Sequence, residues 1–342
     1  MSEYQYYEFQ AVDRPLTKAQ MAELRARSTR ANITPTRFQN VYHWGDLKGN
    51  PLDWTERYFD VFVYVANWGT NQFMVKLPRR LLDAEAAWRY AMEEALDLHT
   101  RGDAVVLEFV SHDDEGGYWI EDEEAEGWMP ALLPLRAELA GGDLRALYLG
   151  WLAGVAPGAS HGDDDFDDNY DDYDDEEDDK PDDEALEPPV PAGLHQISAA
   201  LDALTDFLRI DRDLLAVAAQ SSPALPDAPA DGDLQRWIAA LPAAEKDALL
   251  IQLASAPAPA HAELLRRFHR ETTPYPDATP RRRSIGAMRA AAQELGDKRR
   301  REERSGKRPS GNARRARPPS PEPATSTASP AAKKSSGSRS RR

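Results

Sequence analysis

The sequence predicts an α+β N-terminal domain, in which helices cover an antiparallel sheet, followed by a small all-α helical domain. Three observations support this prediction. Short segments rich in aromatic and β-branched residues are concentrated in residues 1–155, which also hold seven of the eight tryptophans. Apolar residues recur at helical spacing later in the chain. A block of acidic residues separates the two parts.

The composition changes along the chain place the domain boundaries. We expect an α+β domain over residues 1–156, an acidic disordered linker over 157–192, a helical bundle over 193–272 and a basic disordered tail over 273–342. The linker and tail are assigned because neither carries a sustained apolar face and both are rich in charged or turn-forming residues.

The N-terminal elements follow from local patterns. Residues 58–66 and 72–77 are two strands joined by a turn that contains Gly69, and 95–100 and 104–110 form a second hairpin around Gly102. Thr17 is expected to cap a helix that runs to residue 28. The remaining predictions are strands at 3–12 and 38–44 and closing helices at 128–140 and 144–156.

The second domain shows only helical periodicity. One apolar stripe contains Leu194, Ile197, Leu201, Leu204 and Leu208, and a second contains Leu234, Trp237, Ile238 and Leu241. The Pro-rich stretch at residues 221–233 separates them as a loop. These stripes and two shorter apolar groups downstream predict a bundle of four or five helices.

The net charge of −17 is the sum of strongly opposed segments. Residues 163–187 hold 17 acids and one base, whereas residues 281–342 hold 19 bases and 5 acids. At low salt each segment is the nearest counter-charge of the other, at high local concentration. This suggests the hypothesis that the linker competes with nucleic acid for the tail; weak cation binding by the linker stays open beside the interpretation as a solvated spacer.

Several classes of protein and site are disfavoured. The chain has no cysteine, so disulfides, thiolate zinc sites and cysteine nucleophiles are excluded. The opening residues do not form a signal peptide, and the longest apolar run is too short to span a bilayer, so we expect a cytoplasmic protein with no membrane contact. The histidines are scattered, and the acidic block lacks the glycine of an EF-hand loop, so no metal or other cofactor is predicted.

Several distinctive motifs lie along the first 270 residues: YQYYEFQAVDRPLT, NVYHWGDLKGNP, ERYFDVFVYVANWGT, LPRRLLD, LPLRAELAGGDLRALYLGWLAG and LPAAEKDALL. With these motifs the chain resembles a widespread bacterial protein family to which no activity is assigned. The resemblance implies a bacterial, cytoplasmic protein and transfers no catalytic residue. The family's members continue past the helical domain into an Arg- and Glu-rich helical extension. In this chain the corresponding region is short and rich in Pro and Ser.

One polar cluster at a predicted strand end contains His43, Asp46 and Lys48 and is a candidate for general acid–base chemistry. A local hydrogen-bond network is the competing interpretation. No nucleophile elbow, P-loop or dinucleotide fingerprint accompanies the cluster. We therefore favour a non-enzymatic interaction or adaptor protein with an unidentified protein partner, and keep an enzyme as an alternative.

The tail supports a second alternative, a nucleic-acid-associated protein. Its basic clusters can neutralise phosphates without reading sequence, since no aromatic residue follows Tyr275. A tail that only adds solubility is the competing interpretation. The candidate nucleic-acid-binding residues are Arg281, Arg282, Arg283, Lys298, Arg299, Arg300, Arg301, Arg304, Lys307, Arg308, Arg314, Arg315 and Arg317.

Overall fold

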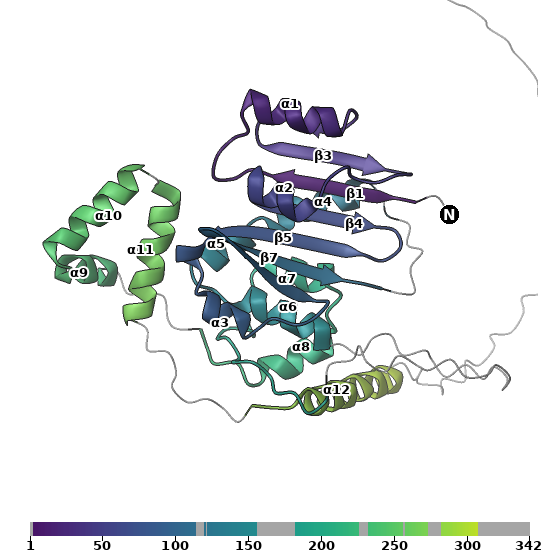
Figure 1. The fold of residues 1–342 in the computed structure, drawn as a ribbon. Coiled ribbons are helices and arrows are strands. Elements are labelled where there is room, and N and C mark those ends of the chain that lie inside the picture. Colours follow the sequence, from purple (N-terminus) through teal and green to yellow (C-terminus); the bar gives the residue numbers. More distant parts are fainter. Residues whose placement is uncertain are drawn as a thin grey trace, which may run out of the picture. The chain divides into compact units, whose positions relative to one another are not determined.

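The computed structural model describes residues 3–113, 120, 122–155, 182–225, 232–255, 257–272 and 282–306 (Figure 1). The chain divides into two compact units, Met1–Arg299 and Arg300–Arg342. The fold below is that of the first, whose last helix runs on to Gly306. None of the helices in the described ranges combines the length and apolar character needed to cross a bilayer.

Within these ranges, antiparallel strands form one sheet in the order β2-β3-β1-β4-β5-β7-β6. Both predicted hairpins are confirmed, because β4 pairs with β5 and β6 with β7 across the expected turns. The α+β prediction for the N-terminal part is confirmed as well. The strands are β1 (Gln5–Gln10), β2 (Asn32–Ile33), β3 (Arg37–Tyr42), β4 (Val61–Ala66), β5 (Asn71–Pro78), β6 (Leu96–Arg101) and β7 (Ala104–Ser111).

The helices, in chain order, are α1 (Lys18–Arg27), α2 (Pro51–Arg57), the 3-10 turn η1 (Arg79–Leu81), α3 (Ala84–Trp88), α4 (Asp122–Leu132), α5 (Leu135–Ala140), α6 (Arg145–Val155), α7 (Ala199–Phe207), α8 (Arg212–Ala219), α9 (Asp233–Ala240), α10 (Ala243–Ser255), α11 (Pro257–Thr272) and α12 (Ile285–Gly306). Thr17 caps α1 as predicted, with Gln20 completing a capping box. The sequence analysis missed α2, which begins with Asn50 as its cap and Pro51 in its first turn.

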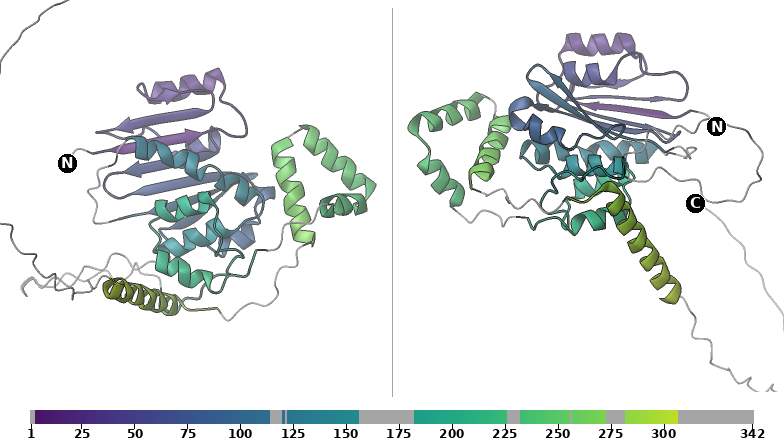
Figure 2. Two further views of the ribbon diagram at one scale, coloured as in Figure 1. Left: turned by 180° about the vertical axis from the view of Figure 1, so that it is seen from behind. Right: turned by 60° about the horizontal axis from the view of Figure 1, so that its bottom comes forward.

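Side chains alternate across the sheet and divide its residues between two cores. Tyr7 and Phe9 of β1 face the smaller core, which α1 and α2 cover with Leu24 and Trp54. Tyr6 of β1 faces the larger core, to which α4, α5, α6, α7 and α8 contribute. Figure 2 shows helices on both sides of the sheet. The sheet is therefore buried on both faces along its central strands.

The two halves of the predicted helical domain pack differently. Helices α7 and α8 place Leu204 and Leu214 in the larger core of the sheet, and the side-chain amide of Asn71 donates to the carbonyl oxygen of Phe207 at 2.8 Å. By contrast, α9, α10 and α11 share a small core of Leu241, Leu249 and Leu264. Apolar stripes show that a helix is amphipathic, but they do not show which surface it covers, so the predicted bundle of residues 193–272 combined two different packing units.

The predicted linker and tail also contain ordered parts. Within the tail predicted for residues 273–342, α12 is a helix whose Ile285, Met288 and Ala292 join the larger core. These residues lie three and four positions apart on one helix face, and the Arg-rich composition around them concealed the pattern. In the linker predicted for residues 157–192, Leu186 forms a β-bridge with Ser284, just before α12. Residues 156–181, 273–281 and 307–342 lie outside the described ranges.

Candidate functional site

The strand-end cluster lies in the loop that follows β3, where Leu47 is buried while His43, Asp46 and Lys48 are exposed. The His43 ring lies edge-on to Tyr4, with ring centroids 5.9 Å apart. No hydrogen bond or ion pair joins His43 to Asp46 or Lys48 in the described part of the chain, and all three residues are exposed. The structure therefore does not bring the predicted acid–base groups together in a cavity.

Asp46 instead holds its own loop against the sheet. Its Oδ1 accepts a hydrogen bond from the Tyr7 hydroxyl at 2.6 Å and another from the Leu47 backbone N–H at 2.6 Å. Burial, and then the Asp46 carboxylate, raise the pKa of Tyr7 far above its ordinary value, so the phenol remains a donor at neutral pH. This local hydrogen-bond network joins Asp46 to Tyr7 and Leu47, and neither His43 nor Lys48 takes part in it.

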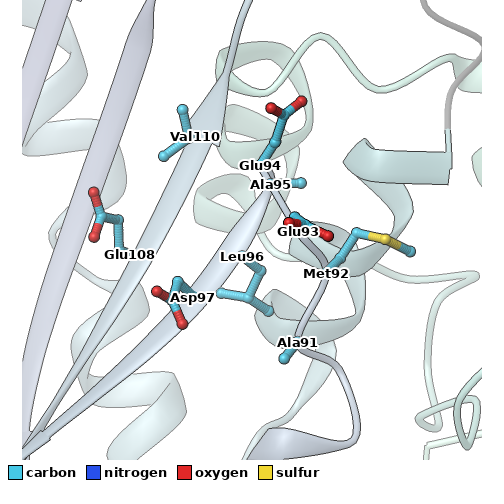
Figure 3. Close-up of a pocket in the computed structure, with 9 residues that line it drawn as sticks. All are labelled: Ala91, Met92, Glu93, Glu94, Ala95, Leu96, Asp97, Glu108 and Val110. Carbon is cyan, nitrogen blue, oxygen red and sulfur yellow. The ribbon is translucent and has the colours of Figure 1, made fainter. Parts of the chain in front are cut away.

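A second polar group, which the sequence analysis did not select, lies at the β6 edge of the sheet. A cleft of about 450 Å³ is lined there by apolar residues and by Glu93, Glu94, Asp97 and Glu108 (Figure 3). Glu108 lies 2.6 Å from His99 Nε2 through Oε2 and accepts from Gln72 through Oε1. The predicted hairpin carried the signal, because Asp97 pairs with Glu108 across β6 and β7 and His99 lies on the same face.

The cleft offers carboxylates without a nucleophile or a metal site. The carboxylate of Glu108 already has two partners, and no group of three or more His, Asp or Glu residues in the described ranges is arranged to hold a metal ion. A region of this charge favours cations over anions as ligands.

A buried carboxylate joins residues of the predicted linker to residues of the predicted tail. Glu187 is 2% exposed, although it belongs to the acidic block. Its carboxylate accepts a hydrogen bond from the Tyr148 hydroxyl at 2.6 Å. It accepts two more from Arg283, at 2.9 Å to Oε2 and 2.6 Å to Oε1. We call Glu187, Tyr148 and Arg283 the Glu187 site.

Two members of the Glu187 site, Arg283 and Tyr148, keep their charge states at neutral pH. The hydrogen bond from Arg283 to Glu187 raises the pKa of the guanidinium, while burial raises the pKa of the Tyr148 hydroxyl well above its ordinary value. The Arg283 cation is therefore paired with the Glu187 carboxylate, which also accepts a hydrogen bond from the neutral Tyr148 phenol. Bidentate pairs like the one between Arg283 and Glu187 are among the stronger hydrogen bonds of proteins.

Further contacts fix α12 along its length. Arg289 donates to Asp183 Oδ1 at 2.6 Å and to the Val155 carbonyl oxygen at 2.9 Å, and Arg299 donates to Asp213 Oδ1 at 2.8 Å. Together with the apolar stripe, these contacts hold the helix on the larger core from Ile285 as far as Arg299. Its later turns bear four consecutive cations at exposed positions, which we call the basic surface: Lys298, Arg299, Arg300 and Arg301.

The other predicted nucleic-acid-binding residues have different positions. Arg282 donates to the carbonyl oxygen of Glu187 at 2.5 Å and Arg283 belongs to the Glu187 site, so both bind the chain itself. Arg304 lies in α12. The remaining candidates lie outside the described ranges: Arg281, Lys307, Arg308, Arg314, Arg315 and Arg317.

Comparisons with models of known protein families, with proteins of described function and with solved structures find no match for this chain. The family resemblance of the sequence motifs therefore stays a prediction.

Proposed function

We propose that this protein is a non-enzymatic binding protein that holds nucleic acid through the basic surface of α12 and the basic chain that follows it. The observation that carries the proposal is the contrast within one helix. Ile285 and Met288 are buried in the larger core, whereas Lys298, Arg300 and Arg301 are exposed. A helix fixed at one end can present its cations to phosphates with little further loss of conformational freedom.

The expected recognition is electrostatic and independent of base sequence. Cations that neutralise phosphates release counterions, which supplies affinity and makes it depend on salt. No aromatic residue follows Tyr275, so base stacking does not contribute beyond that point. The protein should accordingly bind double-stranded DNA of unrelated sequences with similar affinity.

The test compares two charge-matched variants of the full chain by fluorescence anisotropy with a labelled DNA duplex. In the helix variant, Lys298, Arg300 and Arg301 are changed to Gln, and Arg299 is kept because it donates to Asp213. In the control variant, one lysine and two arginines at exposed positions elsewhere are changed to Gln: Lys18, Arg30 and Arg79. Both variants lose the same charge.

We expect the helix variant to bind about 10-fold or more weakly at 50 mM salt and the control variant to bind within about 2-fold of the wild type. Equal losses in the two variants would show that only net charge matters, and would contradict a binding site on α12.

A second candidate function, protein binding by the helical unit α9–α11, is favoured by a separate observation. Adjacent residues Leu250 and Ile251 of α10 are 63% and 66% exposed, although neighbouring Leu249 is buried. Exposed apolar side chains side by side are typical of a partner surface. The Leu250→Glu, Ile251→Glu double variant should lose a partner that the wild-type chain captures, and retention of every captured protein would remove this candidate.

A further inference from the structure

Strand β6 is an outer strand of the sheet, with β7 as its neighbour on one side. In an antiparallel pair, the backbone groups of alternate residues point toward the neighbouring strand. Just before β6, the Ala95 carbonyl oxygen accepts from the Val110 N–H, so the N–H and C=O groups of Leu96, Leu98 and Thr100 point away from β7. An outer edge of this kind is a template for a further strand.

The chain itself covers only the beginning of this edge. The Leu96 N–H donates to the Met92 carbonyl oxygen at 2.8 Å, and the Met92 N–H donates to the Leu96 carbonyl oxygen at 3.0 Å. The next outward N–H, that of Leu98, donates to the side chain of the preceding residue, Asp97 Oδ1, at 2.7 Å. Among the residues that the structure describes, none forms a hydrogen bond with the Leu98 carbonyl oxygen or with the backbone of Thr100.

The open part of the edge is complementary to a second copy of itself. When two antiparallel copies of β6 meet with His99 opposite His99, Leu98 of one copy lies opposite Thr100 of the other. Each such pair can exchange two backbone hydrogen bonds. In the same register, Asp97 of one copy lies opposite Arg101 of the other, so opposite charges meet on both sides of the twofold axis.

The charge of the cleft at this edge favours the same register. Asp97 shares the cleft with Glu93, Glu94 and Glu108, and no cation is among the described residues that line it. Asp97 and Glu108 lie on neighbouring strands, with their carboxylates on the same side of the sheet (Figure 3). A guanidinium that enters from a second copy therefore supplies a counter-charge that the lining lacks.

Arg101 and Asp97 both have capacity for this contact. The Arg101 side chain is 62% exposed, and its ion pair with Glu56, at 3.2 Å, is its only one in the described part of the chain. A guanidinium carries several N–H donors, so it can hold a second carboxylate beside the first. Asp97 Oδ1 accepts from Leu98, but Oδ2 lies 3.6 Å from His99 Nε2, which is beyond hydrogen-bond distance.

We propose that two copies of this chain associate through β6, so that the sheet continues across an antiparallel β6–β6 interface. Arg101 of each copy enters the acidic cleft of the other and pairs with Asp97. The Leu98 N–H then donates to the Thr100 carbonyl oxygen of the second copy, which releases the Asp97 carboxylate for Arg101. Both copies use the same surface, so the assembly closes as a dimer.

The association should be weak, because the paired segment is short. Small interfaces of this type are typical of transient complexes, and we expect a dissociation constant on the order of micromolar. Self-association through β6 does not depend on the proposed nucleic-acid binding, and every experiment below is done without nucleic acid.

A charge exchange tests the ion pairs, with sedimentation velocity of the full chain over a concentration series at about 50 mM salt. Asp97→Arg and Arg101→Asp each place like charges opposite one another and should weaken dimerisation about 10-fold or more. The double variant Asp97→Arg, Arg101→Asp restores opposite charges and should dimerise within about 3-fold of the wild type. A double variant that is as weak as the single variants would contradict the register.

The wild-type chain provides the first decision. If it stays monomeric up to about 1 mM, where a micromolar dimer is saturated, the proposal is overturned. A monomer whose cleft instead binds an added Arg-rich peptide would assign this edge to another partner and would equally contradict self-association.

A proline substitution tests the backbone pairing. Thr100→Pro removes an N–H that points away from β7, so it should abolish the dimer and leave the pairing of β6 with β7 in place. Thr100→Val keeps the N–H and should dimerise like the wild type. Circular dichroism checks that both variants are folded. An unchanged dimer in Thr100→Pro would show that strand pairing at this edge is not the contact.

A disulfide at the symmetry axis tests the register directly. The chain has no cysteine, so His99→Cys introduces a single thiol. In the proposed register this position faces itself without backbone hydrogen bonds between the copies, where Cα atoms lie about 4.5 Å apart, within reach of a disulfide. Mild oxidation should link two copies of His99→Cys, while the control His112→Cys, at an exposed position outside β6, should stay unlinked. Equal cross-linking of the two variants, or none in His99→Cys, would overturn the proposal.

Discussion

The strand-end cluster and the Glu187 site both combine an acid with a cation or a phenol, but they differ in how their groups are held. Asp46 and its neighbours lie close together in the sequence and are exposed. Glu187, Tyr148 and Arg283 come from three distant segments and enclose a carboxylate that is almost completely buried. The polar residues that are adjacent in the sequence lie in an exposed loop. The stronger ion pair, between Glu187 and Arg283, forms where segments distant in the sequence meet.

The physical reason for this difference is desolvation. Charges that remain in water interact weakly, because the solvent screens them. A charge removed from water must be paired and hydrogen-bonded, and loss of one partner then leaves the other uncompensated. The two clusters should therefore respond very differently to mutation, and the predictions below are ordered by the size of that response.

The largest effect is expected at the Glu187 site. Glu187→Ala leaves the Arg283 guanidinium without its carboxylate and should lower the free energy of unfolding by about 3 kcal/mol, at the lower end of the range for buried pairs because Arg283 retains some solvent contact. Urea unfolding measures this loss. The control is Glu85→Ala, which removes an exposed pair with Arg89 and should cost less than about 0.5 kcal/mol. Equal effects would contradict the difference.

The buried apolar residues of α12 should contribute a similar amount to the free energy of unfolding. Met288 is fully buried, so Met288→Ala is expected to destabilise the protein by about 2 to 3 kcal/mol through lost burial and a cavity. Leu250→Ala on α10 removes an exposed side chain and should change stability by less than about 0.5 kcal/mol. A small effect of Met288→Ala in thermal unfolding would mean that α12 does not belong to the core.

The pH dependence of stability tests the environment of a buried carboxylate, Asp60. Burial alone would raise the pKa of Asp60, but Lys76 and the backbone N–H groups of Asp13 and Val12 outweigh it and hold the pKa below its ordinary value. The unfolded state then binds more protons, so this stabilisation is present above an unfolded pKa of about 3.9 and is lost as the pH falls through the folded pKa.

Asp60→Asn should therefore cost about 2 kcal/mol at pH 7 and make stability less dependent on pH in the acidic range. Asp46→Asn keeps an acceptor for Tyr7 and should cost less than about 1 kcal/mol. Unfolding curves between pH 2.5 and pH 7 measure both variants. An unchanged acidic limb in Asp60→Asn would contradict the assignment.

The smallest effect is expected at the exposed members of the strand-end cluster. His43→Ala and Lys48→Ala should each change the free energy of unfolding by less than about 0.5 kcal/mol, because neither side chain is buried. A loss above about 1 kcal/mol from Lys48→Ala would reveal a structural contact of this side chain and contradict the difference between the strand-end cluster and the Glu187 site.

The sequence predicted the elements whose signals are local. The hairpins around Gly69 and Gly102 and the cap at Thr17 follow from turn residues and short-range periodicity, and the structure confirms them. The assembly of α7 and α8 onto the sheet could not be predicted in this way. Leu204 and Leu214 mark apolar helix faces, but the choice of packing partner depends on the tertiary structure.

The candidate site was only partly visible for the same reason. The cations of the basic surface were recognised from composition, but their position on a helix was not, because Ile285, Met288 and Ala292 form a sparse stripe inside an Arg-rich segment. Glu187 resembled sixteen other acids of its block. Glu187 is distinguished by its tertiary hydrogen bonds with Arg283 and Tyr148, which the sequence does not reveal.

The salt dependence of DNA binding tests the central claim, a phosphate-binding surface on α12, most directly. The logarithm of the association constant is measured against the logarithm of salt concentration for the wild type, the helix variant and the control variant. We expect the slope of the helix variant to be shallower by about 2 to 3, while the control variant keeps the wild-type slope. Identical slopes for the two variants would contradict it.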